Sequence, residues 1–140
     1  TGTSQIDRNA DANNVGVKRV KVKRLDSLME DFPRLVETKL IKCDVEGYEL
    51  FVFRGAMRII ERSRPFVILE IGHYDTEGYS GRDVYNFFDS REYISLAMIG
   101  DNTLARTNPA MEHEKAISVN RVMVPKERLS DIQDKILILN

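Results

Sequence analysis

The chain has 140 residues, of which 42% are hydrophobic and 31% charged, and 21 Lys and Arg against 22 Asp and Glu leave a formal net charge of −1. This length and composition predict one ordinary domain that buries a real core. No apolar run approaches the roughly 18 residues of a transmembrane helix, so the sequence predicts none. The near-neutral net charge argues against a dedicated nucleic-acid binder. The only cysteine, Cys43, excludes an internal disulfide and a cysteine-rich zinc site.

The first residues of the chain are polar. Residues 1–16 are rich in Thr, Ser, Asn, Asp and Gly, which predicts a flexible segment ahead of a domain at 17–140. Ile6 is the only large apolar residue among the first 14, so we expect no secretory leader. Together with the single unpaired thiol, this favours a cytoplasmic protein.

A basic stretch comes next. Val20 and Val22 alternate with Lys21 and Lys23, which is the period of a strand with one solvated face. Five of the seven residues in Lys18–Arg24 are basic. The stretch is either an edge strand protected from aggregation by its lysines or a phosphate-binding stripe.

Helix and strand signals then alternate along the chain. Ser27 and Glu30 have the spacing of a capping box, which predicts a short helix that starts at Ser27 and ends near Pro33. Gly47 precedes a longer run with helical periodicity. After Pro33 we predict a strand at 39–45, a helix at 48–62, a strand at 66–71 and a helix at 82–90. A strand at 93–99 comes next, followed by a loop at 100–115, a strand at 116–124 and a closing helix through 129–136.

This order indicates an α/β fold. Strands and helices alternate in the first part, which predicts parallel strands with right-handed crossovers and helices on the faces of the sheet. The last two strands follow each other directly, so we expect the C-terminal strand to be antiparallel.

Two acidic clusters lie at predicted strand ends. Asp44 and Glu46 follow the strand at 39–45, and Glu70 ends the strand at 66–71, with His73 just beyond it. Ligands of open α/β sheets bind beyond the carboxyl ends of the strands. If the two strands are neighbours, these four side chains face one crevice suited to proton removal or to binding hydroxyl and amine groups.

Each of these residues has a structural interpretation as well. Glu46 and Glu49 are acids that the first turn of a helix favours, and His73 fits an exposed loop residue as well as a base. Asp26 is expected to cap the helix that begins near Ser27, and Cys43 to be a buried small hydrophobe. No tight spacing of metal ligands occurs, so no metal site is predicted.

The chain contains a long ordered series of short motifs. They are Leu25-Asp26, the string I-K-C-D-V-E-G-Y-E at 41–49, Gly55-Ala56, Arg64-Pro65 and Leu69-Glu70, followed by the strand-like NRVMVPKE at 120–127. This series resembles the pattern of the FkbM-type methyltransferase family, which has a Leu-Asp pair, an I-K-x-D-V-E-G-x-E string, a Gly-Ala pair, an Arg-Pro pair and a strand that ends in Leu-Glu. The resemblance covers about residues 18–127.

The resemblance implies a partial Rossmann-like methyltransferase sheet, with S-adenosylmethionine as cofactor and a small-molecule or sugar acceptor that is O-methylated. Asp44 and Glu46 are then polar anchors near the acceptor, Glu70 a base or orienting group, and His73 a second candidate base. The family's upstream Asp-x-Gly-Ala-Asn-x-Gly cofactor motif is missing, because the eight glycines form no G-x-G. The chain therefore looks like the C-terminal part of such an enzyme and is expected to be inactive alone.

The same analogy leaves the strand at 39–45 as an open sheet edge, which predicts pairing with a second copy or low stability. It leaves two alternative functions. The chain is either part of a methyltransferase or a degenerate, non-catalytic interaction module that binds a partner through this edge. A third interpretation is a metal-dependent phosphate-handling domain in which Asp44 and Glu70 work beneath the basic stretch. No nucleic-acid or membrane partner is expected.

Overall fold

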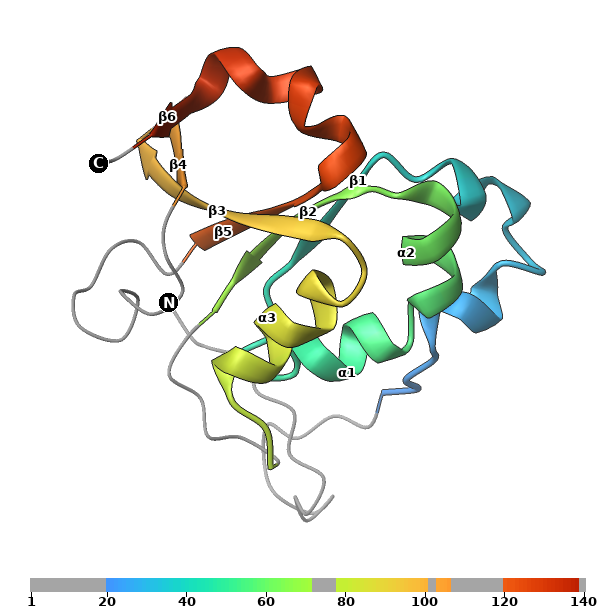
Figure 1. Cartoon of the computed structure of the whole chain (residues 1–140). Helices are drawn as coiled ribbons and strands as arrows, with labels where there is room; N and C mark the ends of the chain where they lie inside the picture. The colour runs from blue at the N-terminus through green and yellow to red at the C-terminus, as the bar shows by residue number, and fades with distance from the viewer. Residues whose placement is uncertain (1–19, 72–77, 101–102, 107–119, 139–140) are drawn as a thin grey trace.

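The computed structural model describes residues 20–71, 78–100, 103–106 and 120–138 (Figure 1). These residues form a sheet with helices on both of its faces. The strands are β1 (Leu40–Cys43), β2 (Phe66–Glu70), β3 (Tyr93–Gly100), β4 (Thr103–Arg106), β5 (Asn120–Pro125) and β6 (Ile136–Ile138). The helices are α1 (Glu49–Arg54), α2 (Met57–Ser63) and α3 (Gly81–Asp89), and the 3-10 helices are η1 (Leu25–Leu28), η2 (Pro33–Glu37) and η4 (Lys126–Lys135).

The sheet is mixed, with strand order β1-β2-β5-β3-β4-β6. β1 and β2 are parallel, and β5 lies between β2 and β3 and is antiparallel to both. β1, β2 and β3 therefore run in the same direction. β4 is antiparallel to β3, and β6 is parallel to β4. The α/β class predicted from the sequence is confirmed. The antiparallel strand predicted at 116–124 corresponds to β5, which is inserted between β2 and β3 rather than added to the end of the sheet.

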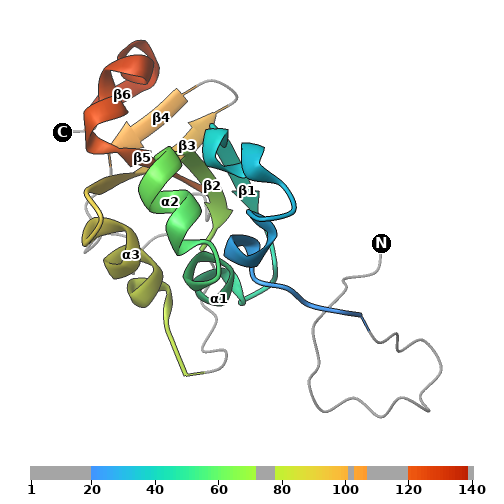
Figure 2. The same ribbon diagram turned by 90° about the vertical axis from the view of Figure 1, so that its right-hand side faces the viewer.

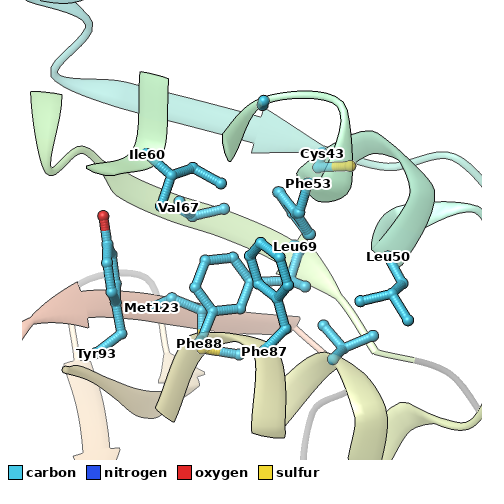
Figure 3. Close-up of a cluster of buried hydrophobic side chains, with 12 residues drawn as sticks. Cys43, Leu50, Phe53, Ile60, Val67, Leu69, Phe87, Phe88, Tyr93 and Met123 are labelled. Atoms are coloured by element: carbon cyan, nitrogen blue, oxygen red, sulfur yellow. The ribbon is translucent and has the colours of Figure 1, made fainter. Parts of the chain in front are cut away.

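Each face of the sheet buries its own apolar cluster. One cluster lies between the sheet and α1, α2 and α3, where Phe88 makes edge-to-face contacts with Phe53 and Tyr93 at centroid distances of 4.8 Å and 5.3 Å (Figure 3). The other lies on the opposite face, where Leu129 and Ile132 of η4 pack against strand residues. Figure 1 shows η4 and the three α-helices on opposite sides of the strands.

The strand predicted around the basic stretch is absent over the part that the structure describes. Residues 20–24 pair with no strand, and the side chains of Val20 and Val22 are 76% and 77% exposed. In Figure 2 this segment approaches η1 from outside the packed helices and strands. Alternation of Val and Lys suits a strand, but a strand needs a neighbour to bond, and the segment has none here.

The helix predicted at 48–62 is two helices that meet at Gly55 and Ala56. η1 packs against this junction, where the Asp26 amide donates a 2.8 Å hydrogen bond to the Gly55 carbonyl oxygen. The Asp26 carboxylate accepts bonds from the amides of Arg58 (3.0 Å) and Ile59 (3.2 Å), in the first turn of α2. Asp26 therefore caps α2, and the prediction that it caps a helix at Ser27 is wrong.

The capping box predicted at Ser27 and Glu30 is also wrong. The Ser27 hydroxyl donates to the Arg24 carbonyl oxygen at 2.7 Å inside η1, which ends at Leu28. A true capping box begins α3, where Asp83 Oδ2 accepts from the Ser80 amide at 2.7 Å and from its hydroxyl at 2.8 Å. The sequence predicted this helix, with a start one residue later.

Two corrections concern the C-terminal part. The loop predicted at 100–115 contains β4, whose Leu104 is the register partner of Ile136 in β6. The closing helix is the 3-10 helix η4, which starts at Lys126 and has a non-helical residue at Ile132. Ile136 therefore belongs to strand β6 and not to the helix. The apolar spacing of Leu129, Ile132 and Ile136 arises because all three side chains pack against the same apolar cluster on one face of the sheet.

Candidate functional site

The two acidic strand ends lie next to each other. β1 and β2 pair in parallel with Cys43 opposite Leu69, so Asp44 and Glu70 occupy the next positions of neighbouring strand ends. Asp44 is exposed, and its Oδ2 lies 3.3 Å from the ammonium group of Lys42. Glu70 is half-buried. Leu69 points into the core beneath α1 and α3, so strand alternation directs Glu70 to the other face of the sheet.

The turn from β1 to α1 has an unusual backbone. Glu46 and Gly47 both have positive φ angles, 50° and 91°. For glycine this conformation carries no steric penalty, whereas for Glu46 it is strained. The side chain of Glu46 is exposed at this turn. Two consecutive left-handed residues bend the chain sharply between the strand end and the helix, so Asp44 and Glu46 stay at the surface.

Glu49 holds this turn from inside. Its side chain is buried, and Oε1 accepts hydrogen bonds from the amides of Gly47 (3.2 Å) and Val45 (3.4 Å). The hydroxyl of Tyr79 donates to the Gly47 carbonyl oxygen and accepts from the Leu50 amide. From the sequence, the structural role predicted for Glu49 was that of an acid favoured in the first turn of a helix. Its position two residues after a turn glycine was the available signal, whereas nothing local marked Tyr79.

Burial keeps two ionisable groups near this turn neutral. It raises the pKa of the Cys43 thiol to about 12, with smaller contributions from the carboxylates of Glu49 and Asp44. It also raises the pKa of Tyr79 to about 12. Cys43 is buried as predicted, and because the thiolate is the reactive form, it is not a nucleophile at neutral pH.

His73 lies outside the described residues, so its place beside Glu70 stays a prediction. Among the residues that the structure does describe, no group of three or more His, Cys, Asp and Glu side chains could hold a metal ion. In the same part of the chain, no helix has the length and apolar character needed to cross a membrane. The strand ends carry the exposed carboxylates of Asp44 and Glu46 and the half-buried carboxylate of Glu70. Such carboxylates can accept hydrogen bonds from hydroxyl and amine groups.

A comparison with family models decides the relationship. The methyltransferase FkbM domain matches residues 1–95, which is more than half of the chain. The chain belongs to this family. The match includes the strand end at Asp44, the turn at Glu46 and Gly47, and Glu70, but it stops before β4 and β5, so it ends earlier than the resemblance described above. No curated protein and no solved structure matches the chain.

Several of the FkbM motif residues have structural roles here. The Leu-Asp and Gly-Ala pairs meet at the junction of α1 and α2, through the bonds of Asp26 described above. A Cβ atom added to Gly55 would lie 3.3 Å from the Val52 carbonyl oxygen of α1, so the tight turn that ends this helix favours glycine. The acidic turn at Asp44 and Glu46, by contrast, projects charge outward.

Proposed function

We propose that this chain is the C-terminal part of a Rossmann-like, S-adenosylmethionine-dependent methyltransferase that O-methylates a small molecule or a sugar. The observation that carries the proposal is the FkbM domain match, which includes the acidic turn at the end of β1. The strand arrangement supports it, because β1, β2 and β3 run in one direction with helices on the faces of the sheet and ligands of such sheets bind at the carboxyl ends.

The carboxylates have separate roles in this proposal. Asp44 and Glu46 are exposed and anchor the acceptor through its hydroxyl groups. Glu70 is half-buried at the end of β2, and it accepts the proton that an attacking hydroxyl group must lose, or orients that hydroxyl. His73 is a second candidate for the same proton.

The described residues do not by themselves form a cradle for the cofactor. The chain has no G-x-G turn. At the glycine turn after β1 the backbone groups are already engaged, since the Gly47 amide donates to Glu49 and the Gly47 carbonyl oxygen accepts from Tyr79. We therefore propose that the cofactor is held by a polypeptide segment outside residues 1–140.

Loss of the cofactor-binding site is expected to reduce the rate more than the carboxylates can increase it. A positioned acid or base contributes about 10²–10⁴-fold to a rate. Positioning two reactants is equivalent to roughly 10⁵–10⁸ M of effective concentration. The 140-residue chain alone is therefore expected to bind the cofactor weakly and to be inactive.

The test is calorimetry with S-adenosylhomocysteine on two samples. One is the chain alone, and the other is the chain mixed with the N-terminal half of an FkbM methyltransferase that carries the Asp-x-Gly-Ala-Asn-x-Gly motif. We expect binding only in the mixture. Micromolar affinity of the chain alone would refute the missing cradle, and a stable complex that binds nothing would favour the non-catalytic interaction module.

An active mixture would then test Glu70. Transfer of labelled methyl groups from S-adenosylmethionine to sugars and small hydroxylated molecules should fall about 100-fold in Glu70→Gln. Glu61→Gln is the matched control, since Glu61 is an exposed carboxylate on α2, away from the strand ends. Equal rates in both variants would remove Glu70 from the proposed chemistry.

A further inference from the structure

A groove lies away from the acidic strand ends. It has a volume of about 550 Å³ and opens between α1, α3 and the end of the basic stretch. Neither Asp44, Glu46 nor Glu70 lines it. α1 and α3 lie side by side in both ribbon views (Figures 1 and 2). A hollow of this size is in the range of small-ligand sites.

Three arginines from different parts of the chain meet in this groove. Arg24 precedes η1, Arg54 ends α1, and Arg91 follows α3. Within the described part of the chain, no carboxylate forms an ion pair with any of the three. The described lining of the groove therefore carries three positive charges and one carboxylate, that of Asp83.

Among the described residues that line the groove, the one carboxylate is already hydrogen-bonded within the protein. Asp83 accepts two hydrogen bonds from Ser80 in the capping box of α3. The bond from the Ser80 amide is the main reason why the pKa of Asp83 lies below its ordinary value, with a smaller effect of Arg54. Asp83 thus stays ionised, and three guanidinium groups face a single negative charge.

Arg91 is held in place before any ligand arrives. Its guanidinium group stacks on the ring of Phe87, 4.0 Å from the ring centroid, and Nη1 donates to the Phe87 carbonyl oxygen at 2.6 Å and to the Ser90 hydroxyl at 3.0 Å. Its buried Nε has no acceptor among the described residues. A fixed guanidinium loses little entropy when it binds an anion.

The remaining surface of the groove is largely apolar. Met57 is half-buried and supplies the larger accessible part of an apolar floor beside the arginines, because Leu50 and Phe87 are almost completely buried. Asn86 adds an amide that can both donate and accept. A simple inorganic anion would leave this floor uncovered.

We propose that the groove binds a soluble phosphate monoester. Its phosphate dianion matches the excess positive charge, and guanidinium groups bind phosphate oxygens in bidentate fashion. Its organic part packs against the apolar floor, chiefly against Met57. In this proposal the basic stretch contributes to phosphate binding through Arg24. The site lies at the helices and not at Asp44 and Glu70, which the metal-dependent interpretation had placed beneath the basic stretch. This site is independent of methyl transfer.

Phenyl phosphate is the probe, because it combines the dianion with an apolar ring. NMR titration of the ¹⁵N-labelled 140-residue chain should shift the amides of Asn86, Phe87 and Arg91. Inorganic phosphate and phenol should each bind at least about tenfold more weakly, since each meets only half of the groove. No shift with millimolar phenyl phosphate, or equal binding of inorganic phosphate, would overturn the proposal.

Variants locate the site. Arg54 is exposed and Arg24 lies in an irregular segment, so Arg54→Gln and Arg24→Gln should fold normally. Each should weaken phenyl phosphate binding by about tenfold, the effect of one charge-assisted hydrogen bond. Arg62→Gln removes an exposed arginine of α2 that does not line the groove, and it should change nothing. Equal weakening by all three variants would overturn the proposal.

A lipid headgroup could present the same phosphate chemistry. Co-sedimentation with phosphatidylcholine vesicles that contain phosphatidic acid separates the two sources. A soluble ligand predicts that phenyl phosphate binds and that the vesicles retain little protein. Retention on the vesicles without binding of phenyl phosphate would refute a soluble ligand.

Discussion

At the scale of single residues, Arg64 connects three parts of the chain. It ends α2 in a left-handed conformation, with φ of 48°. Its guanidinium group forms a two-bond ion pair with Glu127 at 2.7 Å and 3.0 Å, donates to the Arg91 carbonyl oxygen at 2.8 Å and stacks on the Tyr93 ring. The Arg of the family's Arg-Pro pair is thus a structural residue that joins α2, the turn before β3 and η4.

The ion pair makes stability depend on pH. The hydrogen bond from Arg64 lowers the pKa of Glu127 from 4.5 to about 2. A lowered carboxyl pKa stabilises the fold above the ordinary pKa, and this contribution is lost as the pH falls from 4.5 towards 2. Because the Glu127 side chain is 52% exposed, we expect the pair to contribute less than about 1 kcal/mol.

Urea unfolding from about pH 6 to about pH 3 measures this effect. Glu127→Gln should be less stable than the natural chain at the higher pH, and the difference should shrink at the lower pH. Glu61→Gln, on an exposed face of α2, is the control and should leave the pH dependence unchanged. A constant difference across the range would contradict the assignment.

Asp26 provides a second prediction at this scale. Asp26→Ala removes the acceptor for two amides in the first turn of α2 and should lower the free energy of unfolding by about 1–2 kcal/mol. Asp31→Ala changes an exposed carboxylate in the following turn and should have little effect. Chemical denaturation of both variants measures the difference, and equal stability would show that Asp26 does not cap α2.

At the scale of elements, the turn between β1 and α1 shows how a strand end is held for function. Its outer side carries Asp44 and Glu46, whereas its inner side is organised by Glu49 and Tyr79. The strained Glu46 backbone persists because these inner bonds hold the turn in one shape. The exposed carboxylates therefore depend on buried partners for their position.

Glu49→Ala tests this support. It leaves the amides of Val45 and Gly47 without their acceptor, and we expect a loss of at least about 2 kcal/mol in the free energy of unfolding. Glu49→Gln keeps a carbonyl oxygen in place and should lose clearly less. Denaturant unfolding compares the two, with Glu61→Ala as an exposed control. Similar losses in Ala and Gln would show that the acceptor is not what matters.

The elements also show where sequence patterns succeed. Local apolar patterns predicted β1, β2, α3 and β3, because each of them buries apolar side chains that are close together in the sequence. They missed the break at Gly55, since Asp26 creates that junction from 29 positions earlier along the chain. They missed β4 as well, because a four-residue strand between polar segments is stabilised by its neighbours β3 and β6.

At the scale of the whole molecule, β1 is the terminal strand of the described sheet, with β2 on one side only. Exposed apolar side chains lie near it. Leu40 in β1 is 55% exposed, and Phe32 and Val36, at η2 just before it, are 60% and 40% exposed. An apolar edge with free backbone groups attracts another strand. We propose that the chain pairs through β1, with a second copy when no other segment covers it.

Sedimentation velocity over a range of concentrations tests this pairing. We expect association that Leu40→Lys weakens, since a charge on an edge strand opposes pairing. Ile99→Lys places the same charge on an exposed apolar residue of β3, which is an interior strand, and should leave association intact. A natural chain that stays monomeric at high concentration would refute the proposal.

The sequence by itself determined the α/β class, the strands and helices with strong periodicity, the family and the acidic strand ends. These properties depend on residues that are close together in the sequence, because apolar residues follow local patterns in helices and strands and motifs occur in a fixed order. Only the tertiary structure decided the place of β5 within the sheet, the cap of Asp26 on α2, the support of the turn by Glu49 and Tyr79, and the meeting of Arg24, Arg54 and Arg91. Each of these depends on contacts between distant segments, and such contacts leave no period in the sequence.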